Sequence, residues 1–132
     1  MTKIDSEKVE VNASAQKVFE LLSNFNNFQK LMPPQVTNWS STDSECTFTI
    51  NGMATIGMKI LEKNPHSLIK ISSNGKVPFD FFLFVHLEEV GEKCNAQLKF
   101  ESDLNAMMAM MVEKPLTNFF NLLVKKLQEI YK

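Results

Sequence analysis

Hydrophobic residues recur at steps of three and four along the last quarter of the chain, from Leu104 to Tyr131. This spacing predicts one long helix with a wide apolar stripe. The stripe consists of Met108, Val112, Leu116, Phe119, Leu123, Leu127 and Ile130, widened by Phe120, Val124 and Tyr131 and, near its start, by Met107 and Met111. A helix of this size is about 40 Å long. It must lie against a large apolar surface.

The preceding residues alternate between apolar and polar in short segments separated by turn residues, which predicts antiparallel strands. The expected strands are 3–11, 36–41, 45–50, 53–63, 68–74, 79–88 and 94–102. After the first strand, Ser14 is placed to cap a short helix, and a second short helix ends before Pro33 and Pro34. There is no internal repeat and no linker, so we expect residues 1–132 to form a single α+β domain.

Two hairpins have a predicted register. Around Asn51 and Gly52, a three-residue loop of residues 50–52 with Gly52 left-handed pairs Phe48 with Ala54, which keeps both apolar sets on one face. In the last hairpin, a turn over residues 90–93 pairs Leu87 with Ala96. Both registers follow from the requirement that one face of the sheet be buried.

The last hairpin leaves Phe82, Phe84 and His86 on its outer face. Neighbouring exposed phenylalanines usually mark a contact. A homodimer or another protein contact through Phe82 and Phe84 is therefore one hypothesis, and cover by a loop or by the N-terminal strand is the alternative.

Composition narrows the function classes. The net charge is −1, and all fourteen basic residues are lysines, so the chain lacks the arginines favoured for gripping phosphate. We therefore expect no nucleic-acid partner. No apolar run approaches the roughly 18 residues that span a bilayer, so stable membrane insertion is not expected. The N-terminus does not resemble a signal peptide, and the expected location is therefore the cytoplasm. Cys46 and Cys94 are expected to be small buried residues, with a disulfide as the alternative.

Candidate catalytic groups are few. His66 lies in a predicted turn and His86 on the outer face, and no motif supplies a nucleophile, a phosphate loop or a metal site. Asp80 stands among phenylalanines, but alternation predicts that it faces solvent. Trp39 is expected in the core or in a pocket wall. No catalytic residue, metal or cofactor is predicted.

The order of elements, together with particular residues, resembles the START-like superfamily, also called SRPBCC or the birch-pollen-allergen (Bet v) superfamily, which includes polyketide cyclases and dehydrases. Val11-Asn12-Ala13-Ser14-Ala15 followed by Val18-Phe19-Glu20-Leu21-Leu22-Ser23 is similar to its strand-to-helix transition. Leu31-Met32-Pro33 and the hairpin at Gly91 also look like family features, whereas Asn24 stands where the family often has Asp. The resemblance implies a helix-grip fold, in which a curved sheet of six or seven strands wraps around the C-terminal helix and a cavity lies between them.

The leading hypothesis is a protein that binds an apolar or amphipathic small molecule, lipid-like or polyketide-like, in that cavity. The predicted ligand-binding residues are Phe48, Ile56, Met58, Ile71, Phe81, Leu98, Met108, Met111, Phe119 and Phe120. The methionines at 107–111 would form an adaptable cavity mouth or simply fill the core. A bend or break at Pro115 would let them move as a gate.

Two alternatives stay open. A protein-interaction module with a filled core would use the face of Phe82 and Phe84. An enzyme of the cyclase, dehydratase or hydrolase type would need an acid–base pair facing the cavity, and the strand phases place almost no titratable residue there.

Overall fold

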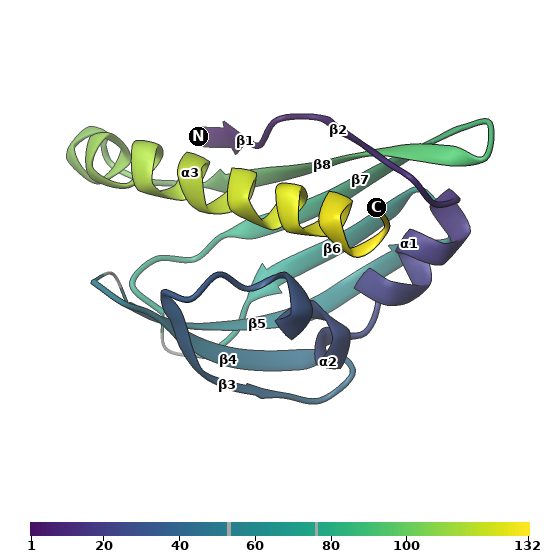
Figure 1. Ribbon diagram of the computed structural model, residues 1–132. Helices are drawn as coiled ribbons and strands as arrows, with labels where there is room; N and C mark the ends of the chain where they lie inside the picture. Colours follow the sequence, from purple (N-terminus) through teal and green to yellow (C-terminus); the bar gives the residue numbers. More distant parts are fainter. Residues whose placement is uncertain (53, 76) are drawn as a thin grey trace.

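In the computed structural model, which describes residues 1–52, 54–75 and 77–132, a curved antiparallel sheet wraps around a long C-terminal helix (Figure 1). Within these residues the sheet has the strand order β1-β8-β7-β6-β5-β4-β3, and β2 also pairs with β8. The strands are β1 (Thr2–Asp5), β2 (Val9–Val11), β3 (Val36–Ser41), β4 (Glu45–Ile50), β5 (Ala54–Asn64), β6 (Leu68–Ser73), β7 (Phe82–Val90) and β8 (Lys93–Ser102). The helices are α1 (Ala15–Leu22), α2 (Phe25–Phe28), the short 3-10 helix η1 (Gln29–Leu31) and α3 (Ala106–Ile130).

This architecture confirms the predicted helix-grip fold, with two boundaries corrected. The single strand expected over residues 3–11 is two strands, because Ser6 leaves the regular ladder: its hydroxyl oxygen accepts a 2.9 Å bond from the backbone N–H of Leu98. The strand expected from residue 79 begins at Phe82 instead. Met53, the expected first residue of the fifth strand, lies outside the described residues.

The hairpin between β4 and β5 is displaced from the predicted register. Phe48 pairs with Ile56, and Ile50 with Ala54, so the predicted pair of Phe48 with Ala54 is wrong. Gly52 has a φ of 82°, as expected. The error is a shift of two residues, which returns every side chain to the same face, so alternation alone does not detect it.

The last hairpin has the predicted register. Leu87 pairs with Ala96, and the side chains of Phe82, Phe84 and His86 lie on the face that points away from α3. The inward residues of β7 and β8 are buried in one hydrophobic cluster with the apolar face of α3.

Polar caps begin both of the longer helices. The Ser14 hydroxyl accepts a 3.2 Å bond from the backbone N–H of Lys17 at the start of α1, as predicted. The Asn105 side-chain oxygen accepts a 2.9 Å bond from the N–H of Met108 at the start of α3. Each cap satisfies an N–H that the first helical turn leaves without a partner.

The buried stripe of α3 is confined to the part of the helix that follows Pro115, which we call its second half. The buried residues of this helix are Leu116, Phe119, Phe120, Leu123, Val124 and Leu127. Met107 and Met111 were expected to widen the stripe, but they are 73% and 69% exposed, and Ile130 is 38% exposed. The reason is that the first turns of α3 project past the end of β8, where there is no sheet to cover that side (Figure 1). Helical periodicity identifies a face but not the extent of its partner.

Polar contacts fix the same half of α3 to the N-terminal segment. The backbone N–H of Glu7 donates to the Asn121 side-chain oxygen at 2.7 Å, and the Gln128 amide donates to the carbonyl of Glu10 at 2.9 Å. The Tyr131 hydroxyl reaches the carbonyl of Lys17 at 3.4 Å. In the described part of the chain, the first half of α3 makes no such bond to another element.

A bend or break was expected at Pro115, and the helix is continuous through this residue, so the break is absent. Proline has no N–H to donate to the carbonyl of Met111. Two residues later, the Thr117 hydroxyl donates to the carbonyl of Glu113 at 2.7 Å, a bond within the same helix. An unbroken helix on both sides of Pro115 counts against a gate hinged at that residue.

Among the described helices, none is long and apolar enough to cross a membrane.

Gly57 allows two parts of the sheet to approach closely, because a Cβ there would collide with the backbone carbonyl oxygen of Asn74. The backbone N–H of Asn74 in turn donates to the Gly57 carbonyl at 2.8 Å.

We expect Gly57→Ala to lower the free energy of unfolding in urea by about 1–3 kcal/mol, as overpacking does. Exposed Lys59 on the same strand gives the control: Lys59→Ala should change it by less than about 0.5 kcal/mol. Equal stability of the two variants would contradict this account.

Candidate functional site

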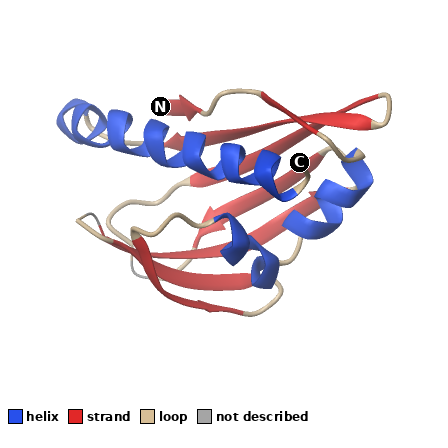
Figure 2. Cartoon of the chain, in the orientation of Figure 1, coloured by secondary structure: helices blue, strands red, loops and turns tan. Residues whose placement is uncertain are grey.

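A cavity of about 340 Å³ lies between the concave face of the sheet and α3. Figure 2 shows α3 across this face, with the short helices α1 and α2 lying toward the C-terminal end of α3. The cavity is lined by Phe28, Met32, Phe48, Ile50, Gly52, Ala54, Ile56, Met58, Pro78, Phe79, Phe81, Leu83, Phe100, Met108, Met111, Val112, Pro115, Leu116, Phe119, Phe120 and Leu123. These residues come from strands, from α3, from the segments that precede β3 and β7, and from the turn between β4 and β5.

The lining is hydrocarbon, aromatic ring and thioether. Among the described lining residues, none has a charged, hydroxyl or amide side chain. A bound molecule would therefore find apolar contact inside and no side chain to hydrogen-bond with. This arrangement suits binding by exclusion from water.

One end of the cavity is closed and the other is open. Phe28 is fully buried and Leu123 is 2% exposed, so they lie at the closed end. Met111 is 69% exposed, and Pro78 and Pro115 are also exposed. The mouth therefore lies where the first half of α3 faces the segment before β7, at the end of the molecule that carries the free turns of α3.

Stacked aromatic rings make up one wall. The rings of Phe81 and Phe100 stack with centroids 5.5 Å apart, and Phe100 lies 5.7 Å from Phe120, which lies 5.9 Å from Phe119. All four rings line the cavity. Because each ring packs against the next, the wall is fixed in shape by more than one element of the fold.

A second aromatic pair joins a lining residue to one outside the lining. Phe48 lines the cavity, and Trp39, which does not line it, stacks on Phe48 at 5.2 Å between ring centroids. The indole N–H of Trp39 donates to the Ser41 hydroxyl at 3.0 Å. Trp39 is therefore in contact with a lining residue without lining the cavity itself.

Most of the predicted ligand-binding residues line the cavity, and two do not. Those that line it are Phe48, Ile56, Met58, Phe81, Met108, Met111, Phe119 and Phe120. Ile71 and Leu98 face inward and are buried, but Leu98 lies nearer the closed region beside Leu22 and Leu127. Strand alternation gives the face of a residue, whereas its position along the sheet decides whether it meets the cavity.

The prediction missed several lining residues from the strands and from α3, and also others from segments outside the regular strands. Phe28 and Met32 line the cavity from the short helical segment, and Pro78 and Phe79 line it from the segment before β7. For the first two, helical spacing before Pro33 gave a signal of burial, but nothing indicated which cavity they would meet. Pro78 lies just before, and Phe79 within, the strand expected over residues 79–88, so the sequence did not indicate that this segment leaves the sheet.

The titratable candidates face away from the cavity. His66 is exposed and packs edge-on against the ring of Phe19, with centroids 5.8 Å apart. Exposed Asp80 accepts a 3.3 Å bond from the Ser73 hydroxyl. The pKa of His86 is lowered, first by partial burial and then by the charge of Lys99. Within the described residues, no three His, Cys, Asp or Glu side chains come together to hold a metal ion.

The outer phenylalanines form a separate surface on the other side of the sheet. Phe82 is 39% exposed and Phe84 is half-buried, and the Lys70 ammonium lies 5.0 Å and 6.0 Å from their ring centroids. β1 and β2 pair with the edge of β8 and do not lie over these rings. Cover by the N-terminal strand, one of the predicted alternatives, is therefore not seen.

Comparisons with known proteins agree with this geometry. The fold is that of the START-like class, and the chain belongs to the family described as polyketide cyclase / dehydrase and lipid transport, which matches residues 1–130. No curated protein sequence matches the chain.

Solved structures with this fold have little sequence in common with the chain. A START superfamily protein from Mycobacterium smegmatis is 15% identical with a TM-score of 0.71, covering 98% of this chain and 96% of its own. Protein XoxI from Bacillus cereus is 14% identical with a TM-score of 0.79, covering 99% and 96%. A norcoclaurine synthase point mutant from Thalictrum flavum, in complex with a transition-state analogue, is 16% identical with a TM-score of 0.77, covering 98% and 93%. At these identities the likeness shows the fold alone.

Both cysteines are free and buried. Burial raises the pKa of the Cys46 thiol from 9.0 to about 12, and burial followed by the charge of Glu89 raises the pKa of Cys94. The contribution of Cys46 to stability is therefore complete below about pH 9 and is lost as pH rises toward 12, because only the unfolded thiol ionises in that range.

We expect neither thiol to react with Ellman's reagent at pH 8 in the native protein, because the reactive thiolate is scarce and the sulfur is covered. Both should react after unfolding in guanidinium, and absorbance at the dye's maximum measures the thiols released. Fast reaction of a native thiol would show that its strand opens readily.

Proposed function

We propose that the protein binds one apolar or amphipathic small molecule, lipid-like or polyketide-like, in the cavity between the sheet and α3. The observation that carries this proposal is an open cavity of about 340 Å³ whose described lining offers no polar side chain. An engineered cavity of about 150 Å³ holds benzene. The cavity here has roughly twice that volume and therefore suits a correspondingly larger molecule. Transfer of that molecule from water supplies roughly 25 cal/mol per Å² of buried apolar surface, before the costs of association.

The polar end of an amphipathic ligand would stay at the mouth. A hydroxyl or carboxylate carried to the closed end, beside Phe28 and Leu123, would lose its water without gaining a side-chain partner. At the mouth, near exposed Met111, Pro78 and Pro115, it would keep its hydration. Membership of a family that includes lipid transport supports the same class of ligand.

Binding is proposed in place of catalysis because of the lining itself. A cyclase or dehydratase step needs a group that moves a proton at the reacting atom. The titratable candidates, His66, His86 and Asp80, are exposed residues that do not line the cavity. The described lining thus gives a bound molecule a shaped apolar environment without an acid–base pair.

Filling the cavity should abolish binding. Val112 is half-buried and lines the cavity from α3, so Val112→Trp should place an indole in the space a ligand would occupy. We expect the Kd for the apolar fluorescent probe N-phenyl-1-naphthylamine to rise by roughly tenfold or more, since most of the probe's apolar contact is lost. The probe's fluorescence in a titration gives Kd, and circular dichroism confirms the fold.

The neighbouring exposed residue supplies the control. Glu113→Trp adds the same indole one position along α3 but outside the lining, so its Kd should match that of the unaltered protein. Probe binding should also change the fluorescence of Trp39 in the unaltered protein through its stacked partner Phe48. No binding by the unaltered protein, or equal binding by both variants, would contradict the proposed cavity function.

Self-association through the outer face is a second proposal, supported by the 39% exposure of Phe82 on a face that β1 and β2 leave open. We expect the Phe82→Ser/Phe84→Ser variant to sediment more slowly than the unaltered protein at equal concentration, because an apolar contact between two copies is lost. Unchanged probe binding would show that the variant is folded. An unchanged sedimentation coefficient would remove the dimer.

A further inference from the structure

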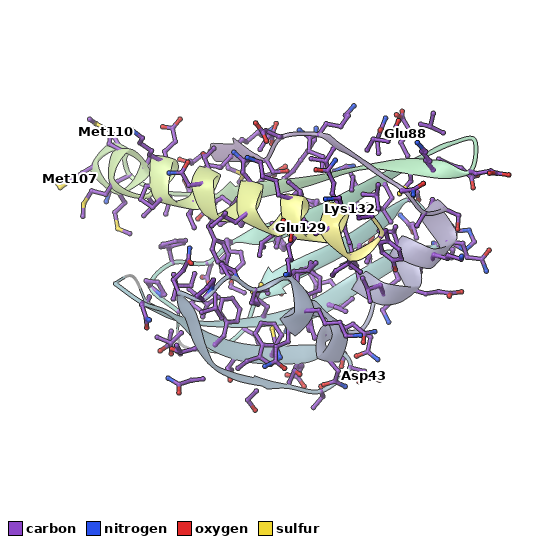
Figure 3. The ribbon with its side chains drawn as sticks, viewed as in Figure 1. Asp43, Glu88, Met107, Met110, Glu129 and Lys132 are labelled. Atoms are coloured by element: carbon purple, nitrogen blue, oxygen red, sulfur yellow. The ribbon has the colours of Figure 1, made fainter. Side chains whose placement is uncertain are left out.

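The sulfur-containing side chains that the structure describes differ widely in their access to solvent. Cys46 and Cys94 are buried, and among the described methionines Met58 is 3% exposed. In contrast, the first turns of α3 carry Met107 and Met110, which are 73% and 80% exposed. Figure 3 shows these two side chains at the free end of α3, pointing away from the sheet. Oxidants in solution therefore meet thioethers at the end of the molecule where the cavity opens.

Met111 joins the two features. It is 69% exposed, and it also lines the cavity at the mouth. Met107 and Met110 are exposed but do not line it, and Met58 lines it but is covered. Among the described methionines that line the cavity, Met111 is the one whose residue is mostly exposed, since Met32 and Met108 are half-buried. Its side chain is therefore open to a reagent in solution and borders the space that a ligand would occupy.

We propose that Met111 is an oxidation site at which a hydroperoxide weakens ligand binding by converting the thioether to a sulfoxide. The inference rests on the proposed binding function. A lone pair of the thioether sulfur attacks the terminal oxygen of the hydroperoxide, the O–O bond breaks, and an S–O bond forms. The sulfur loses two electrons, the hydroperoxide is reduced to the alcohol or water, and its proton moves to the leaving oxygen.

The effect on binding follows from the chemistry of the lining. A sulfoxide is polar and needs a hydrogen-bond donor or water, and the described lining has no side chain to donate one. Oxidised Met111 must turn toward solvent, which removes apolar contact at the mouth, or keep a polar oxygen against the ligand. Both outcomes reduce affinity, and reduction by methionine sulfoxide reductases would restore it.

The cysteines do not compete for this role. Their thiols are covered and stay protonated at neutral pH, because burial raises the pKa of both groups. Since the thiolate is the form of cysteine that attacks a hydroperoxide, thiol oxidation is disfavoured on two counts. Together with Met1, which is 77% exposed, the exposed thioethers of α3 are thus the most accessible sulfur in the described part of the chain.

The test compares each protein before and after mild hydrogen peroxide treatment, at a dose for which peptide mass spectrometry finds residues 107, 110 and 111 oxidised and Met58 reduced. For the unaltered protein, we expect the Kd of N-phenyl-1-naphthylamine to rise roughly tenfold, the scale of one unpaired polar group against an apolar surface. Treatment with the two sulfoxide reductases should return the Kd to its starting value.

Two variants assign the effect. Met111→Leu removes the sulfur at nearly constant volume, and the ratio of its Kd after and before oxidation should be close to one, whatever its starting Kd. Met107→Leu/Met110→Leu changes exposed residues outside the lining, so both its starting Kd and its tenfold response should match the unaltered protein.

Each outcome bears on the inference. Persistence of the response in Met111→Leu, or an unchanged Kd when residue 111 is oxidised in a folded protein, would overturn it and leave the proposed binding function standing. Failure of the reduced, unaltered protein to bind the probe would instead overturn the proposed function, and the oxidation role with it.

Discussion

The packing of one half of a helix against a curved sheet is the constraint on which the rest of this structure depends. Leu116, Phe119, Leu123 and Leu127 are buried against the sheet, and this removal of apolar surface from water is the largest favourable term available to hold α3 in place. Asn121 and Gln128 then fix the orientation of the same half through bonds to the N-terminal segment. The first half has no such anchoring within the described residues, and the cavity lies beneath this half and the adjoining part of the buried half.

An apolar cavity of this kind selects its ligand differently from a polar site. A site built from hydrogen-bonding groups rejects a ligand that lacks a partner for them, because a buried polar group is then left unpaired. Here the described lining sets no such requirement, so discrimination rests on size, on shape against the stacked wall of Phe81, Phe100 and Phe120, and on the exclusion of polar groups from the closed end. Such a site would accept a range of related apolar molecules.

The sequence allowed most of the fold to be predicted because two physical periods dominate it. A period of two placed Phe82 and Phe84 outward and Leu98 inward, and a period near 3.6 identified the buried face of α3. Neither period contains information on where an element ends in space. For this reason the two-residue register shift at Phe48 and the exposure of Met107 went undetected.

The candidate site was harder to predict for the same reason. A cavity is defined by which inward side chains fail to meet one another, and that depends on distances between elements distant in sequence. Phe79 contributes to the lining because its segment leaves the sheet, whereas Ile71 is fully buried in the sheet and does not line the cavity. Local patterns therefore predict candidate walls better than the volume between them.

The contrast between the two halves of α3 also explains why methionine suits the mouth. Where the helix meets the sheet, branched and aromatic side chains such as Leu123 and Phe120 hold few conformations and define a fixed surface. Where it projects into solvent, Met108 and Met111 face the cavity without a partner layer to order them. An unbranched thioether can adjust to ligands of different outline there, whereas leucine would present one shape. The same exposure that makes the mouth adaptable leaves the sulfur of Met111 open to oxidation, so adaptability and redox sensitivity have one structural cause.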